Sequence, residues 1–422
     1  MKITVALIDD YEENQTQSLS NIKHAIESIS EFPHEVEFKN IPLKEKNELI
    51  EKITGILSDS SKLDTAPNSL RSLEGVDVLF LDYQLPKLDG HAWLTAEDLA
   101  GAFRAFSQIP VVCILNRFHE VDFDLSLLAP TVTAADLHLN AESLVCGTLW
   151  VKPESRKLPI DMNRENFRPW YWPSLPELID DIHQCRKDLM GIELKDTKVF
   201  DFLNFNEDDF RALTKTALGF INPQSPEPQN ATFLDFFMHG CNGCITEEIK
   251  TWVLTNPEEI ERKKIATSVI VAQMKRWLTH MVMASGDAVA DIPHLISRMY
   301  WIQQGDVSIN DTWLRAGSFT NEKILHDALE EFTFKKRHWL SRDGYWTQRI
   351  EASDKLDKLY QIDVEIDELN LPVYLEDFSI FVTREETDEF SSALNSIWSN
   401  RYISRTAFKA REIKYAPKVR LI

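Results

Sequence analysis

The chain has 422 residues, enough for two or three domains at the usual ~100–200 residues each. It holds 67 acidic and 46 basic residues, a formal net charge of −21, and such an acidic chain repels phosphate backbones, so we do not expect nucleic acid as a partner. No run approaches the ~18–20 apolar residues that cross a bilayer, and we expect no membrane partner. Five cysteines are few and odd in number, as is typical of reduced thiols in a cytoplasmic protein.

Over about the first 190 residues, short apolar runs alternate with amphipathic patterns. The expected strands are 3–8, 35–41, 76–82, 110–115 and 148–152, and the expected helices are 14–30, 43–59, 92–107 and 175–190. This alternation is typical of an α/β fold with a parallel, doubly wound sheet. In such sheets, ligands bind at the carboxyl ends of the strands.

Three long segments are expected between the predicted strands and helices of this sheet. The segments 58–74, 117–146 and 153–174 are expected as surface insertions, which cost little in loop entropy. The last of them holds the aromatic sequence FRPWYWP at 167–173. We interpret this cluster as a lid packed on the sheet or on a second domain, and a groove for a partner is the alternative.

A second, mostly helical unit follows a Pro- and Gln-rich segment at 222–230, which is a candidate linker. We divide the chain into a first domain at 1–190, a connecting segment at 191–230 and a mostly helical C-terminal domain at 231–422. The expected helices of this last domain are 231–254, 257–284, 292–303 and 321–339, and its small α+β end at 371–422 contains the strand-like sequence PVYLEDFSIFVT.

Charged residues follow the predicted strands at the edge of the sheet where ligands bind. Asp9 and Asp10 come directly after the first strand, Asp82 ends the third strand, and Lys152 ends the last. Charges in such places cost desolvation energy unless they share a partner. Carboxylates that pack together favour a hard divalent cation such as Mg2+. One carboxylate would then act as a nucleophile toward a phosphoryl group, while the lysine and the metal offset the developing charge.

The same residues form motifs of a known family. IDD at 8–10, LDYQLPKLDG at 81–90 and VKP at 151–153 resemble the receiver, or phosphoacceptor, domain of two-component response regulators. The resemblance covers about residues 1–190. It implies a flavodoxin-like, doubly wound sheet of five parallel strands, with Mg2+ as the cofactor and a histidine kinase as the partner.

The resemblance also implies a role for each residue of the motifs. Asp82 is the expected phosphoacceptor and a metal ligand. Asp10 is expected to bind Mg2+ directly, and Asp9 through water. The backbone carbonyl of Gln84 is expected as the third protein ligand, and Lys152 as the clamp on the phosphoryl group.

The sequence departs from the family pattern at the switch positions. Receivers usually place a Thr or Ser at the end of the fourth strand, where this chain has Leu115, or Asn116 with a shift of one residue. They also usually carry an aromatic residue on the fifth strand, three residues before the lysine. Leu149 stands there, with Trp150 adjacent. These departures leave phosphate acceptance in place and put the conventional switch in doubt, although the Asn116 amide is able to donate in place of the hydroxyl.

Three hypotheses follow for the function. In the first, Asp82 accepts phosphate from a histidine kinase and the protein acts as a phosphate sink, a buffer or a docking regulator, with a cognate response regulator or effector as a further partner. The layout resembles the buffering receiver of bacterial antiviral two-component systems. In the second, phosphorylation controls an effector activity in 231–422. In the third, a degenerate receiver serves as an interaction scaffold. We expect no enzyme beyond weak autophosphatase activity, and a cryptic C-terminal activity belongs to the second hypothesis.

One further motif, HGCNGC at 239–244, has CxxC spacing next to a histidine. Zinc requires four ligands, and no second cysteine pair completes such a site. We therefore interpret Cys241 and Cys244 as structural thiols at a helix break, with a metal or redox role as the alternative.

Overall fold

A computed structural model describes most of the chain. The residues described are 1–9, 11–59, 62–63, 70–83, 85, 95–116, 133–151, 167–223, 225–241, 243–255, 259–302, 313, 325, 327–354, 371–391 and 400–405.

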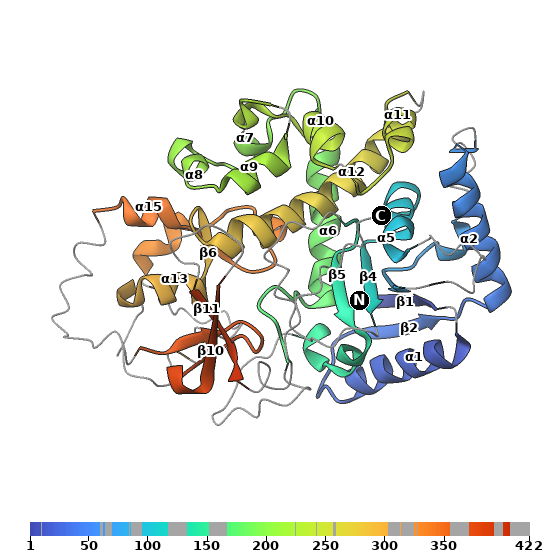
Figure 1. Cartoon of the computed structure of the whole chain (residues 1–422), viewed down its shortest axis with the longest axis horizontal. Helices are drawn as coiled ribbons and strands as arrows, with labels where there is room; N and C mark the ends of the chain where they lie inside the picture. Colours follow the sequence, from blue (N-terminus) through green and yellow to red (C-terminus); the bar gives the residue numbers. More distant parts are fainter. Residues whose placement is uncertain are drawn as a thin grey trace.

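A five-stranded parallel sheet forms the core of the first half (Figure 1). Its strands are β1 (Lys2–Ile8), β2 (Glu35–Lys39), β3 (Val78–Asp82), β4 (Val111–Asn116) and β5 (Leu137–Asn140). They lie in the order β2-β1-β3-β4-β5, and every neighbouring pair is parallel. This order is that of a flavodoxin-like doubly wound sheet. The predicted α/β class and sheet type are confirmed.

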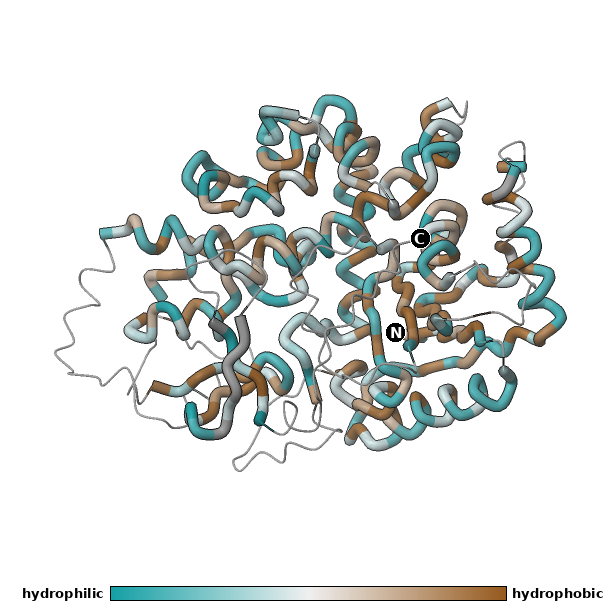
Figure 2. The backbone as a smooth tube through the Cα atoms, viewed as in Figure 1, coloured by the Kyte–Doolittle hydropathy of each residue, from teal (hydrophilic) through white to brown (hydrophobic). Residues whose placement is uncertain are grey.

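Continuous apolar runs make β1, β3 and β4 the central strands, because both of their faces are covered. The helices between and after the strands are α1 (Glu12–Glu27), α2 (Leu43–Ser58), α5 (Ala96–Phe106) and α6 (Leu175–Met190). Helix α2 buries Leu49, Ile50 and Ile53 on one face, and each such side chain contributes about 1.5–3 kcal/mol. Figure 2 shows apolar residues concentrated along the strands and polar residues along the outer side of α1.

The prediction of a fifth strand at 148–152 is wrong. The strand is β5, inside the segment that we expected as an insertion, and residues Gly147–Leu149 form a 3-10 turn. In β5, Leu137 and Leu139 are buried, and the Asn140 side chain accepts from the Glu142 N–H to begin the next turn. The apolar residues that follow are buried by packing instead of pairing, since Trp150 lies edge-on to the Phe32 ring.

The second half combines helices with two small sheets. Its helices are α7 (Val199–Phe202), α8 (Glu207–Arg211), α9 (Lys215–Ile221), α10 (Phe233–Asp235), α11 (Glu247–Thr255), α12 (Glu259–Trp277), α13 (Ile292–Arg298) and α15 (Thr347–Glu351). Strands β6 (Val289–Asp291) and β7 (Gly344–Trp346) pair with each other, and β8 (Val373–Leu375), β9 (Ile380–Val382), β10 (Thr387–Ser391) and β11 (Asn400–Ser404) form a sheet in the order β10-β11-β8-β9. The expected mostly helical unit with a small α+β end is therefore supported in part.

One expected helix, 321–339, is not present in its described part. Residues Asp327–Phe332 and Arg337–Trp339 form short 3-10 turns. The chain turns there because Thr333 bridges to Tyr345 of β7 and the Phe334 N–H donates to the Gly344 carbonyl at 2.8 Å. Pairing with a strand replaces the helix that the sequence pattern favours.

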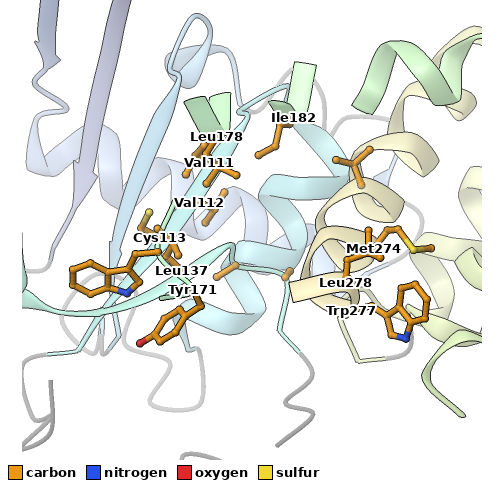
Figure 3. Close-up of a cluster of buried hydrophobic side chains, with 14 of the residues drawn as sticks. Val111, Val112, Cys113, Leu137, Tyr171, Leu178, Ile182, Met274, Trp277 and Leu278 are labelled. Atoms are coloured by element: carbon orange, nitrogen blue, oxygen red, sulfur yellow. The ribbon is translucent and has the colours of Figure 1, made fainter. Parts of the chain in front are cut away.

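Helix α12 joins the two halves. It contacts both α5 and α6 (Figure 1). Gln273 donates to the carbonyl of Thr133 at 2.5 Å, and Arg186 of α6 donates to the Ser268 hydroxyl at 2.9 Å. On its other side, α6 places Leu178 and Ile182 beside Val111 and Val112 of β4 (Figure 3).

The aromatic segment at 167–173 packs on the second half of the chain. Trp170 is 2% exposed, and its backbone N–H donates to the Glu376 carbonyl at 2.9 Å. The Arg168 N–H donates to the Asp377 carbonyl at 3.0 Å, and the Arg401 guanidinium lies over the Trp170 ring. The interpretation as a segment packed on the second unit is confirmed. Among the helices that the structure describes, none is both long and apolar enough to span a membrane.

Candidate functional site

Two acids lie side by side at the carboxyl edge of the sheet. Asp9 follows β1 directly, and Asp82 is the last residue of β3. Because Ile8 pairs with Leu81, Asp9 and Asp82 occupy the next positions on neighbouring parallel strands, which are about 4.8 Å apart. Asp9 is fully buried and Asp82 is 8% exposed. The prediction that these strand-end carboxylates lie at one edge of the sheet is confirmed for this pair, and the structure adds that their strands are neighbours.

The carboxylate of Asp9 also shapes the chain that leaves β1. Its Oδ1 accepts from the N–H of Tyr11 at 2.9 Å, and Tyr11 is the residue that precedes α1. An aspartate that accepts from the N–H two residues further on stabilises a tight turn. The first acid of the pair is therefore held by the strand behind it and by the turn in front of it.

The other flank of Asp82 is formed by β4 and β5. Leu115, which is 1% exposed, is the register partner of Asp82. The expected hydroxyl position is thus an apolar side chain, and Asn116 comes one residue later, paired with Asn140 of β5. Two amide side chains, instead of a Thr or Ser hydroxyl, end the strands on this side of the acid pair.

The other predicted switch positions lie elsewhere. Leu149 and Trp150 belong to the turn after β5, and both are buried. A Cβ added to Gly147 would lie 3.4 Å from Ile29, just past the end of α1. That is the edge where the strands begin, since the Glu35 N–H at the start of β2 donates to the Met1 carbonyl. Residues 147–150, which come shortly before Lys152 in the sequence, are therefore at the edge opposite to Asp82.

Three predicted site residues, Asp10, Gln84 and Lys152, lie outside the described residues. Their predicted roles as metal ligands and phosphoryl clamp stay predictions. Lys152 was expected at the carboxyl edge because it ends the predicted fifth strand. Since that prediction is wrong, it no longer supports this position for Lys152.

A lysine that the sequence reasoning missed lies at the carboxyl edge. Lys46 of α2 is fully buried, and its Nζ is 3.2 Å from the backbone carbonyl oxygen of Asp9. The same Nζ donates to the Oε1 of Gln15, a buried residue of α1. A signal was available, because Lys46 precedes Leu49 and Ile50 by three and four residues and so falls on the apolar face of α2.

The two carboxylates described at this edge offer oxygen ligands of the kind that a hard cation prefers. The carboxylates of Asp9 and Asp82 fit Mg2+ by their chemistry and by their placement on adjacent strands. The described residues contain no group of three or more His, Cys, Asp or Glu side chains arranged to hold a metal. Asp10, the expected third carboxylate, is outside that set.

The CxxC motif has no signs of a reactive site. Cys241 and Cys244 are buried next to a π-helical turn at Phe236–Gly240, and all five cysteines of the chain are free thiols. Burial raises the pKa of Cys241 and raises the pKa of Cys244 to about 12. Thiols with such pKa values are poor nucleophiles and poor metal ligands, which supports the structural interpretation.

In comparisons with known proteins, no family model, no curated protein and no solved structure matches this chain.

Proposed function

We propose that the protein is a phosphoacceptor of the two-component receiver type, which takes a phosphoryl group from a histidine kinase onto Asp82. One observation carries this proposal: a buried carboxylate pair, Asp9 and Asp82, ends two adjacent strands of a parallel sheet with the order β2-β1-β3-β4-β5. Such an edge is where ligands bind in doubly wound sheets. At 8% exposure, Asp82 retains some contact with solvent.

In the proposed reaction, a carboxylate oxygen of Asp82 forms a bond to phosphorus as the bond between phosphorus and the donor histidine nitrogen breaks. The electron pair of the broken bond stays on that nitrogen, which takes a proton from water, and Asp82 becomes an acyl phosphate. Mg2+, held by Asp9, Asp10, Asp82 and the carbonyl of Gln84, would offset the charge on the phosphoryl oxygens. The turn from Asp9 to Tyr11 orients the carboxylate of Asp9 for this role.

A sink, buffer or docking regulator is favoured over a conventional switch by the residue beside Asp82. In the register of the sheet this residue is Leu115, which has no hydroxyl to follow a phosphoryl group. Trp150, the candidate aromatic, is packed against Phe32 at the opposite edge. Neither group of the conventional switch is therefore next to the acid pair.

The test uses the full-length protein with Mg2+ and acetyl phosphate, whose acetate group leaves without needing a proton. We expect phosphate on the wild-type chain and none on Asp82→Ala, measured by gel shift and intact mass. Asp377→Asn is a suitable control, because Asp377 is a buried acid in the other half of the molecule. Absence of labelling on the wild type, or equal labelling of Asp82→Ala, contradicts the proposal.

A further inference from the structure

We propose that Lys46 and Gln15 form an oxyanion-binding corner beside the acid pair, and that this corner, instead of Lys152, holds the oxygens of the phosphoryl group that Asp82 accepts. The inference deepens the proposed function and rests on it for the identity of the anion. The anion-binding property itself can be measured separately from phosphate transfer.

The corner is built from three elements that meet at the carboxyl edge. Lys46 lies in the first turn of α2, which starts at Leu43, a short connection after the end of β2. Gln15 lies in the first turn of α1, and its backbone N–H donates to the Tyr11 carbonyl at 3.0 Å. The Nζ of Lys46 contacts the carbonyl of Asp9, the residue that joins β1 to α1. The ammonium is thus positioned next to one member of the acid pair.

The donors in this corner are oriented by contacts to protein groups. Lys46 Nζ donates to the Oε1 of Gln15, which fixes the orientation of the Gln15 amide. Gln15 is only 5% exposed, yet its Nε2 has no hydrogen-bond partner among the residues that the structure describes. A buried N–H donor without a partner has lost its hydrogen bond to water, so such groups usually mark a place where a ligand or water binds.

The position of the corner suits an oxygen of a group on Asp82. Asp9 and Asp82 are on adjacent strands, and strands are about 4.8 Å apart, so an anion on Asp82 would have the Lys46 ammonium on its β1 side. Charge-assisted hydrogen bonds from an ammonium are about twice as strong as neutral ones. Lys46 would offset the charge on the phosphoryl oxygens, and the amide N–H of Gln15 would add a second, directional contact.

The resemblance to receivers points instead to Lys152. The described residues closest before it, Leu149 and Trp150, are at the opposite edge of the sheet, beside Phe32 and the end of α1. Among the described residues, Lys46 is a buried lysine at the edge where Asp82 lies. Substituting Lys46 and substituting Lys152 should therefore have different effects on phosphate binding, and the two effects can be compared directly.

The first experiment measures binding without group transfer. In an Asp82→Asn background with Mg2+, inorganic phosphate is titrated by calorimetry. We expect Lys46→Met to weaken binding about tenfold or more, and Lys46→Arg to restore part of it. Gln15→Glu should also weaken binding, because its carboxylate pairs with Lys46 and repels the anion. Since Gln15→Glu adds a partner for the buried ammonium, it tests the corner even where Lys46→Met fails to fold.

Lys44→Met is the matched control for Lys46→Met, and Lys152→Met tests the alternative lysine. Lys44→Met changes a lysine two residues away on the exposed side of α2, where its side chain is 90% exposed. Lys152→Met changes the lysine that the family resemblance selects. We expect both to bind phosphate as the Asp82→Asn parent does. Unchanged affinity in Lys46→Met and Gln15→Glu, or a loss in Lys152→Met alone, overturns the inference.

The second experiment measures the rate of labelling by acetyl phosphate in chains that keep Asp82. Lys46→Met should label about tenfold more slowly at low donor concentration, with partial rescue by Lys46→Arg. If the wild type is not labelled but binds phosphate through Lys46, the proposed function is wrong and the anion site remains. If the wild type and Lys46→Met are labelled equally, the proposed function remains and the role of Lys46 is wrong.

Discussion

The imidazole of His294 lies between two buried carboxylates in the second half of the molecule. Its Nδ1 faces the Oδ1 of Asp291, and its Nε2 is 2.9 Å from the Oε1 of Glu376. Each carboxylate also has an arginine at 3.0 Å, Arg342 for Asp291 and Arg401 for Glu376. Burial alone would lower the pKa of His294, but the two carboxylates outweigh it and raise the pKa above its usual value. The two carboxylates therefore favour the charged form of the imidazole.

Stability should depend on this residue in a defined pH range. A histidine whose pKa is higher in the folded state stabilises fully below about pH 6.5, and this stabilisation is lost as the pH rises through the raised pKa. The free energy of unfolding should therefore fall from pH 6.5 upward in the wild type, and fall less in His294→Gln. At pH 6, His294→Gln should cost about 3 kcal/mol, since it breaks a buried charged network. Urea unfolding at several pH values measures both effects.

Two groups serve to check that interpretation. His24 is exposed on α1, and His24→Gln should leave the pH dependence unchanged. Burial raises the pKa of Asp377 to about 6, so its own contribution changes mainly below the range used for His294. A wild type and a His294→Gln variant with the same slope above pH 6.5 would show that the imidazole is not charged in the network.

Prediction of single site residues from the sequence succeeded where a charged residue directly follows a buried apolar strand. Asp9 and Asp82 were found because an acid directly after a buried apolar strand is costly without a function or a partner. Lys46 was missed because its partners, the Asp9 carbonyl and Gln15, come from two other elements. Its place on the apolar face of α2 was visible in the sequence, but which group it meets depends on how α1 and α2 pack.

At the scale of elements, the helix α5 requires a glycine at one position. A Cβ on Gly101 would lie 2.2 Å from the backbone carbonyl oxygen of Cys244, so α5 packs directly on the chain between the π-helical turn and α11. Because a backbone atom cannot move as a side-chain end does, Gly101→Ala should destabilise the fold by about 1–3 kcal/mol despite the higher helix propensity of alanine.

Gly55 of α2 is the matched control for this change. The atom closest to a Cβ there is the Nζ of Lys62 at 4.0 Å, so the methyl group fits without displacement. Gly55→Ala should stabilise the protein by up to about 1 kcal/mol through helix propensity alone. Chemical unfolding of both variants gives opposite signs if the contact is correct, and a stabilising Gly101→Ala would show that α5 and Cys244 are not in backbone contact.

Element prediction failed where short apolar runs compete for the same role. The runs at 137–140 and 148–151 both contain buried apolar residues, and the sequence pattern predicted the strand at 148–152, with 137–140 inside an insertion. In the structure, the first pairs with β4 because Asp136 accepts from the Val112 N–H at 2.7 Å and starts the register. The second run instead packs against the C-terminal end of α1. Such a choice depends on long-range contacts that periodicity does not contain.

At the scale of the whole molecule, a continuous apolar core extends from the parallel sheet into the C-terminal half. The sequence indicated two units, and it correctly placed the aromatic segment at 167–173 as a packing surface. The sequence did not indicate which surfaces of the two units pack against each other. Helix α12 is buried along most of its length between the units, a pattern that the sequence shares with any core helix. The division at about residue 190 stays a prediction, and it can be tested by truncation.

A chain of residues 1–230 should retain secondary structure but lose fixed packing. The truncation removes α12, which covers α5 and α6, and removes the backbone partners of Arg168 and Trp170 at 376–377. Large aromatic side chains that are now buried would face water, and exposed apolar patches of that kind bind hydrophobic dyes. We expect near-native far-UV circular dichroism, a weakened near-UV signal and strong dye binding. Coexpression with 231–422 should restore the near-UV signal, because the same faces can then meet without a covalent link. A truncated chain with a native near-UV spectrum and a cooperative transition of its own would show instead that the first unit folds independently and that its contacts with α12 are dispensable.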